Sequence, residues 1–138
     1  MHVINQYADT IKPLAEMGTR MIGKVKDLIV AEFKASLFIE AEKPSCLLVS
    51  YVGYRMVFRV EIVFKRDGDP PREKLAAKLA AYSLSYDKEP KESLLVAYEF
   101  DRLGNVHLIR RELDSFAGLF LLDVFNAAAQ HGMTLRPS

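Results

Sequence analysis

The sequence predicts an α+β fold: a mostly antiparallel five-stranded sheet in the order α-βββ-α-ββ-α, with the helices packed on one face. Apolar residues recur every three or four positions at both ends of the chain, which indicates amphipathic helices there. Between residues 29 and 65, and again between 94 and 113, apolar and polar residues alternate, which indicates strands. Strands in consecutive runs, joined by short turns and followed by helices, are typical of a layered α+β domain.

The first predicted element is a helix over residues 4–22. Its apolar residues lie mostly three or four positions apart: Ile4, Tyr7, Ala8, Ile11, Leu14, Met17, Met21 and Ile22. Proline removes a backbone donor and disfavours helical geometry in the residue before it. Pro13 therefore predicts either a kink or a main helix that begins near this residue.

Three strands follow the first helix. The alternation from Ile29 to Glu42 predicts a long first strand, bent or broken near Ala35 or Ser36, although residues 28–32 also fit a continuation of the helix. Cys46–Val52 and Arg55–Lys65 are the second and third strands, separated by a turn near Gly53. Together they form an antiparallel meander with one face in the core.

The remaining elements are set by two breaks in the pattern. Residues 66–71 combine charged residues, glycine and two prolines, and Pro71 suits the first position of a helix over Pro71–Tyr82. A hairpin is then predicted from Leu94–Phe100 and Asn105–Leu113, turning near Gly104. A last helix runs from Asp114 to Gly132.

Composition limits the classes of function. The 138 residues fit one domain, 1–138, large enough to bury a core. The 19 basic and 18 acidic residues leave a formal net charge of +1, which supplies no global field toward nucleic acid or an anionic membrane. Cys46 is the single cysteine, and residues 1–7 lack the features of a secretory signal. We therefore expect a cytoplasmic protein without a membrane span.

No motif predicts catalysis, a metal or a cofactor. His2, His107 and His131 are too scattered to suggest a metal site. Cys46 has no basic residue beside it that would activate a thiol, and phosphate-binding glycine motifs are absent from the sequence. The sequence therefore favours a protein that is not an enzyme and needs no cofactor.

A basic strip on the solvent side of the sheet is the one pattern that suits single-stranded nucleic acid. It would be formed by Arg55, Arg59 and Lys65, with Arg110 or Arg111 on another strand and Tyr51 or Tyr54 for stacking. Acidic residues in the same region (Glu32, Glu40, Glu42 and Glu61) can pair with these bases. We expect a charge-balanced face rather than a nucleic-acid site.

The last helix is unusually apolar, and a surface helix normally has a narrower apolar stripe. Either this helix lies across the sheet and is covered by its own chain, or part of it forms a subunit interface. In the second case the interface residues would be Phe116, Leu119, Phe120 and Val124. Exposure of all of them in a monomer would leave a large apolar patch, so some form of cover is required.

The functional prediction is a chaperone-like or other protein-binding domain that acts as a homodimer. Over most of the chain, the predicted order of elements resembles that of the small dimeric chaperones of type III secretion systems, which bind an extended segment of an effector protein. The resemblance is one of layout and implies a dimeric α+β protein that binds proteins. The alternative is a small-molecule or catalytic pocket between the curved sheet and the last helix, with His107, Tyr98 and Glu99 as its polar groups.

Overall fold

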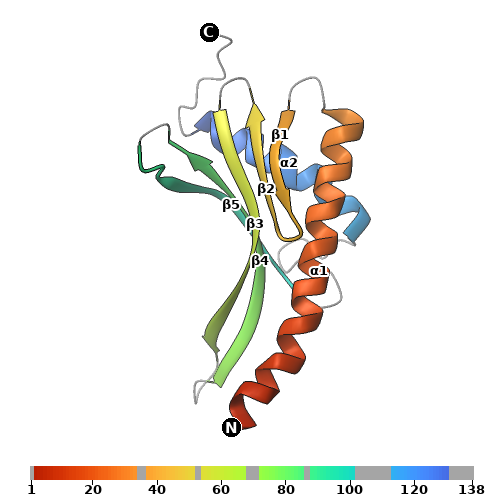
Figure 1. Ribbon diagram of the computed structural model, residues 1–138, viewed down its shortest axis with the longest axis vertical. Helices are drawn as coiled ribbons and strands as arrows, with labels where there is room; N and C mark the ends of the chain where they lie inside the picture. The colour runs from red at the N-terminus through yellow and green to blue at the C-terminus, as the bar shows by residue number, and fades with distance from the viewer. Residues whose placement is uncertain are drawn as a thin grey trace.

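A computed structural model of the chain describes residues 2–33, 37–51, 54–67, 72–85, 88–101 and 113–130. Figure 1 shows two helices on one side of a twisted sheet. The elements, in chain order, are α1 (His2–Glu32), β1 (Leu37–Lys43), β2 (Cys46–Tyr51), β3 (Tyr54–Asp67), β4 (Arg72–Leu84), β5 (Glu92–Phe100) and α2 (Leu113–Gln130). The α+β class is confirmed.

The sheet is a simple meander. Its strands follow the spatial order β1-β2-β3-β4-β5, and each neighbouring pair is antiparallel. The longest pairing joins β3 to β4, from Arg55 opposite Leu84 to Asp67 opposite Arg72. The five-stranded antiparallel sheet expected from the sequence is confirmed, and both described helices pack on one of its faces.

One element differs in type from the sequence prediction. The segment Pro71–Tyr82, which was expected to be a helix, contributes strand β4 instead. Leu75, Ala77, Leu79 and Ala81 alternate with the residues between them, and they point into the core. Pairing along both neighbours, β3 and β5, satisfies the backbone of this segment and outweighs the helix preference of its alanines. The layout that resembled the type III secretion chaperones changes accordingly.

The first helix is longer than predicted. α1 runs through Pro13 and continues to Glu32, so residues 28–32 are helical, and the strand begins only at Leu37. Ile29, at which the predicted strand began, is buried against the core from this helix, so its apolar character reflects helix packing. The predicted strand Asn105–Leu113 falls almost wholly on residues that the structure does not describe.

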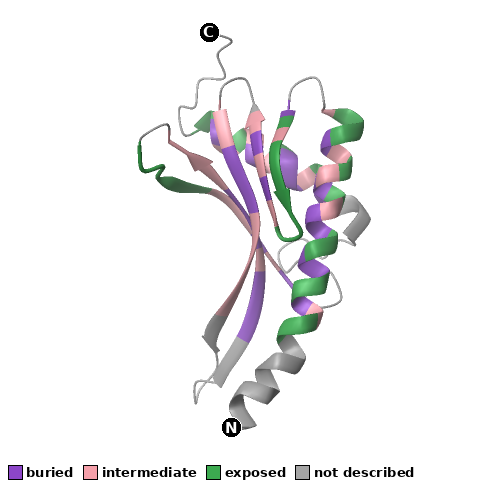
Figure 2. Ribbon diagram, viewed as in Figure 1, coloured by how far each residue is buried: buried purple, intermediate pink, exposed green. Residues whose placement is uncertain are grey.

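Both helices bury their apolar stripes against the same face of the sheet. α1 crosses the sheet obliquely: near its middle, Gly18 lies against Val60 of β3, and its second half passes beside β1. α2 packs on β5 and β3, where Phe120 meets the rings of Phe58 and Tyr98 edge to face. Figure 2 shows buried residues concentrated in the middle of the sheet and along one stripe of α1. The core therefore lies between one sheet face and the two helices.

Candidate interaction surface

The opposite face of the sheet carries no helix among the described elements. We call it the open face; it consists of the alternate residues of β1 to β5 that point away from α1 and α2. Its centre is nevertheless well packed, since Val57 is only 9% exposed and Ala80 is fully buried. Ala80 lies opposite Arg59, whose long side chain spreads over the neighbouring strand.

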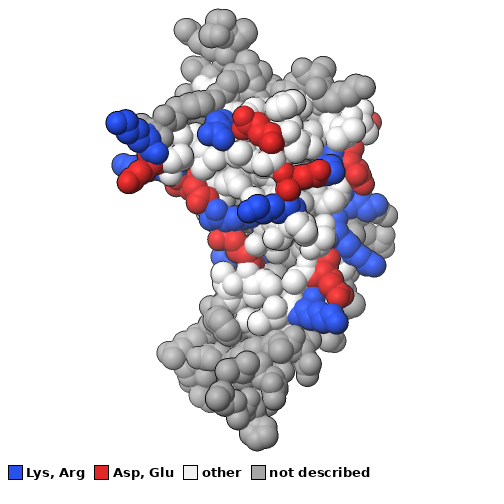
Figure 3. Space-filling view, in the orientation of Figure 1, with Lys and Arg blue, Asp and Glu red and all other residues white. Residues whose placement is uncertain are grey.

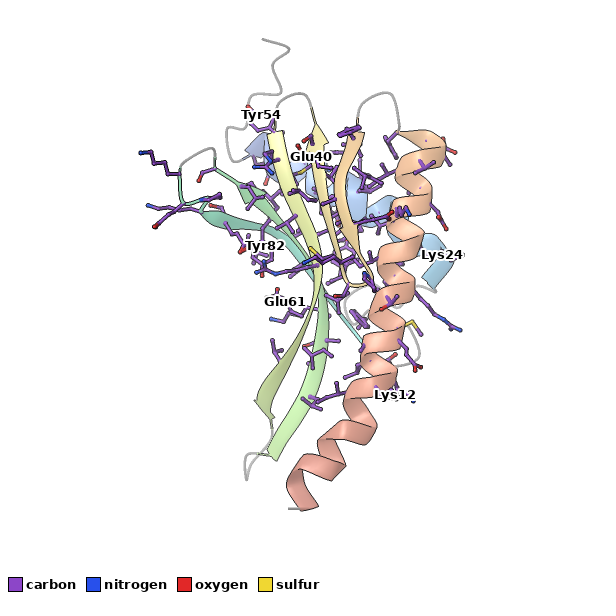
Figure 4. All side chains as sticks on the ribbon, viewed as in Figure 1. Lys12, Lys24, Glu40, Tyr54, Glu61 and Tyr82 are labelled. Carbon is purple, nitrogen blue, oxygen red and sulfur yellow. The ribbon has the colours of Figure 1, made fainter. Side chains whose placement is uncertain are left out.

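A cluster of four side chains from three strands occupies the middle of the open face. The guanidinium carbon of Arg59 stands 4.3 Å from the centre of the Tyr82 ring, which places the cation over the aromatic face. Arg59 also donates a hydrogen bond to Glu92 and lies 3.7 Å from a carboxylate oxygen of Glu61. The hydroxyl of Tyr82 donates to Glu61 in turn. Figure 4 shows Tyr82 and Glu61 on neighbouring strands.

This arrangement keeps the Tyr82 phenol protonated at neutral pH. Partial burial, followed by the hydrogen bond to the Glu61 carboxylate, raises the pKa of Tyr82 above its ordinary value of 10.0. The phenol therefore stays protonated and remains a donor to Glu61. The hydrogen bond from Tyr82 to Glu61 is therefore a structural link between β4 and β3.

A second ion pair lies nearer the β1 edge. Arg55 donates from Nε to an oxygen of Glu40 at 3.1 Å, and both side chains are about one-third exposed. The predicted basic strip is thus balanced by acidic partners, and Figure 3 shows acidic and basic residues intermixed over this face. The side chains of Lys65 and Tyr51 lie outside the described part of the structure, as do Arg110 and Arg111.

Two large apolar side chains flank this charged centre. Phe38 of β1 is 67% exposed, and Leu94 of β5 is 52% exposed. The register places Phe38 opposite Ser50 and Leu94 opposite Tyr82, so both residues lie on the open face. An exposed aromatic ring, an exposed leucine and a paired charge cluster thus share one surface that no described helix covers.

The predicted interface residues of α2 lie mostly in the chain's own core. Phe116, Phe120 and Val124 are 1% exposed or less, and Leu119 is half-buried. The sheet and α1 account for the broad apolar surface of this helix. Leu122, which is 54% exposed, is a large apolar side chain that α2 presents outward.

Of the predicted pocket residues, Tyr98 and Glu99 lie on opposite faces of the sheet. Tyr98 is 4% exposed and donates its hydroxyl to Asp123 of α2, while its ring packs against Phe120 with centroids 5.4 Å apart. Burial and the hydrogen bond to Asp123 raise the pKa of Tyr98. Glu99 lies on the other face of the sheet, opposite Lys78, and His107 is outside the described residues. Tyr98 therefore joins β5 to α2.

Sequence reasoning missed the partners of the two key tyrosines. Tyr82 was assigned to a helix, so its position beside Arg59 could not be foreseen, and the pairing of Tyr98 with Asp123 was not predicted. The alternation Leu75, Ala77, Leu79 and Ala81 was the available signal for β4.

The described residues contain no metal-binding group and no helix that could span a membrane. In the described part of the chain, no three His, Cys, Asp or Glu side chains are grouped in a way that could hold a metal ion. Within the same residues, neither helix combines the length and apolar character needed to cross a bilayer. Comparisons with protein-family models, curated proteins and solved structures found no match.

Proposed function

We propose that this chain is a non-enzymatic protein-binding domain that acts as a homodimer through the open face of its sheet. The observation that carries the proposal is that no described element covers this face, with Phe38 and Leu94 exposed on either side of the Arg59–Tyr82 cluster. Protein interfaces are enriched in aromatic residues and arginine, and the residues that dominate binding energy are often tyrosine and arginine.

The charge pattern favours a second copy as the occupant. Arg55 lies beside Glu40, and Arg59 lies beside Glu92, so positive and negative charges are mixed on this face. A two-fold axis places identical surfaces in contact, and such an interface must be complementary to itself. A surface of mixed sign meets this condition, and the formal net charge of +1 creates little repulsion between copies.

A non-enzymatic role is supported by what the described titratable groups do. The two tyrosines with raised pKa values each hold a carboxylate within the fold, at Glu61 and at Asp123. These contacts link strands and helices to one another. We place the protein in the cytoplasm, where its single, half-buried Cys46 would remain a thiol.

The proposal is tested by sedimentation velocity over a range of protein concentrations, with Phe38→Glu and Leu94→Glu compared against Leu122→Glu. The matched control has a similarly exposed leucine, 54% against 52% for Leu94, on α2 instead of the sheet. We expect the wild type and Leu122→Glu to dimerise, and the two sheet variants to dissociate at least about tenfold more readily. A wild type that remains monomeric, or a dimer lost only with Leu122→Glu, would show that the open face is not the interface.

A further inference from the structure

A groove separates the second half of α1 from the β1–β2 hairpin. It has a volume of about 310 Å³ and is lined by Thr19, Ile22, Gly23 and Lys26 from α1 and by Glu42, Lys43, Pro44 and Leu47 from the hairpin. Ile22 and Leu47 are buried and form an apolar floor. An ion pair between Lys26 and Glu42 crosses the groove. Figure 1 shows α1 and β1 side by side at this place.

Gly23 keeps the groove open, and packing does not explain it. At Gly18, an added Cβ would lie 2.5 Å from a methyl carbon of Val60, so close helix–sheet contact requires glycine there. At Gly23, an added Cβ would meet no atom within 4 Å. Glycine in a helix interior is less favourable than alanine, so its presence fits a place where another molecule approaches the backbone.

The other wall of the groove is formed by β1, at an edge of the described sheet. β1 is the terminal strand of the sheet formed by the described residues, and no described strand pairs with its outer edge. Every residue from Glu40 to Lys43 is exposed, and this edge lies on the side of α1. Unpaired strand edges bind extended segments by adding a strand, with main-chain hydrogen bonds and neighbouring side chains supplying affinity and selectivity.

The charges beside the groove favour an acidic segment. The groove itself contains Lys26 and Lys43 with Glu42, and a second hollow that shares Gly23 is lined by Arg20, Lys24 and Asp27. Basic residues therefore outnumber acidic ones four to two around Gly23. Figure 4 shows Lys24 on the upper half of α1 and Lys12 far below it, toward the N-terminus.

We propose that the groove between α1 and β1 binds an extended, acidic segment of a partner protein, which pairs with β1 as an additional strand. Acidic side chains of the segment compete with Glu42 for Lys26, and apolar side chains alternate toward Ile22 and Leu47. The proposal gives the partner class for the proposed protein-binding function, but it does not depend on the homodimer, because the groove and the open face are different surfaces.

The test begins with a phage-displayed library of random linear peptides selected on the full chain. Enriched peptides are synthesised, and their Kd values are measured for the wild type, Gly23→Leu and Gly23→Ala. Leucine fills the groove, whereas alanine makes the same change from glycine and adds only a Cβ. Both changes favour the helix, so the loss expected with leucine alone, about tenfold or more in Kd, does not come from unfolding.

Two further comparisons establish the chemistry of binding. Lys26→Glu should weaken the binding of an acidic peptide. Lys12→Glu makes the same change of charge at an exposed residue of α1 far from the groove, and it should leave the Kd unchanged. Backbone N-methylation of alternate peptide residues should abolish binding in one register and leave it intact in the other, because a strand pairs through only one of its edges. The dimer-breaking Phe38→Glu variant should keep the wild-type Kd for the peptide.

Three results would overturn the proposal. One is a library without enriched acidic peptides. Another is a peptide that binds the wild type and Gly23→Leu equally well. The third is loss of the dimer in Gly23→Leu, which would show that the β1 edge pairs with a second copy. A monomeric wild type that still binds the peptide through the groove would reject the homodimer alone.

Discussion

At the scale of single residues, replacing the two glycines of α1 by alanine should have opposite effects on the free energy of unfolding. Gly18→Ala should lower the free energy of unfolding by about 1–3 kcal/mol, because the new Cβ meets the two methyl groups of Val60 at 2.5 and 2.8 Å. Gly23→Ala should raise it by up to about 1 kcal/mol. Urea denaturation measures both. Adding Val60→Ala to Gly18→Ala should recover part of the loss, and purely additive effects would contradict the contact.

Tyr98 links stability to alkaline pH. Its pKa is higher in the folded protein than its ordinary value of 10.0, because it is buried and donates to Asp123. Its stabilising contribution is therefore complete below about pH 10 and is lost as pH rises above that value, where the unfolded chain releases its proton first. The free energy of unfolding should fall from about pH 10 upward.

Tyr98→Phe should reveal how much the hydrogen bond from Tyr98 to Asp123 contributes to stability. The variant leaves Asp123 without its phenol donor, and we expect a loss of about 1.5–3 kcal/mol at neutral pH. The free energy of unfolding of the variant should fall less steeply at alkaline pH than that of the wild type. Part of the fall should remain, because the pKa of Tyr82 is also raised. Urea denaturation at several pH values measures both effects. Identical pH profiles for variant and wild type would assign the decline to other groups.

At the scale of elements, α2 stabilises the fold through its inner face. Phe120 is fully buried between Phe58 and Tyr98, so Phe120→Ala should cost about 3–5 kcal/mol. Leu122→Ala, on the outer face of the same helix, should change stability by about 0.5 kcal/mol or less. Denaturant unfolding of the two variants compares the faces directly. Equal costs would mean that Leu122 is also covered.

The elements that sequence patterns predicted best were those with a single possible periodicity. The alternation in Arg55–Lys65 fits a strand alone. The apolar residues of the next segment fit a helix through Leu75, Ala76, Leu79 and Ala80, and a strand through Leu75, Ala77, Leu79 and Ala81. Pro71 also favoured a helix. What decided β4 was its long ladder with β3, a non-local interaction that local patterns do not contain.

At the scale of the whole molecule, the sequence indicated a charge-balanced sheet face but not its partners. Arg55 and Arg59 were correctly placed on the solvent side because β3 was recognised. Their contacts with Glu40 and Glu92 depend on how β1 and β5 are positioned in the sheet, and the Tyr82 contact depends on β4 being a strand. Such pairings arise from topology, which is why they emerged only with the structure.

This balance makes a prediction about nucleic acid. The wild type should show no salt-dependent binding to a labelled single-stranded oligonucleotide in fluorescence anisotropy, because Arg55 and Arg59 are engaged with carboxylates. Replacing Glu40, Glu61 and Glu92 together with glutamine removes the negative charges beside both arginines and raises the formal net charge from +1 by three. The variant should gain oligonucleotide binding that weakens as salt rises.

The same triple variant should dimerise more weakly. An open face that carries only positive charge is no longer self-complementary under a two-fold axis. Sedimentation velocity should therefore show a weaker dimer in the variant that binds the oligonucleotide. An unchanged dimer would mean that the charge cluster lies outside the interface. Salt-sensitive oligonucleotide binding by the wild type would mean that the carboxylates do not neutralise the arginines. A variant that gains oligonucleotide binding and forms a weaker dimer would show what the Glu40, Glu61 and Glu92 carboxylates do. They would determine whether the open face binds a second copy or a polyanion.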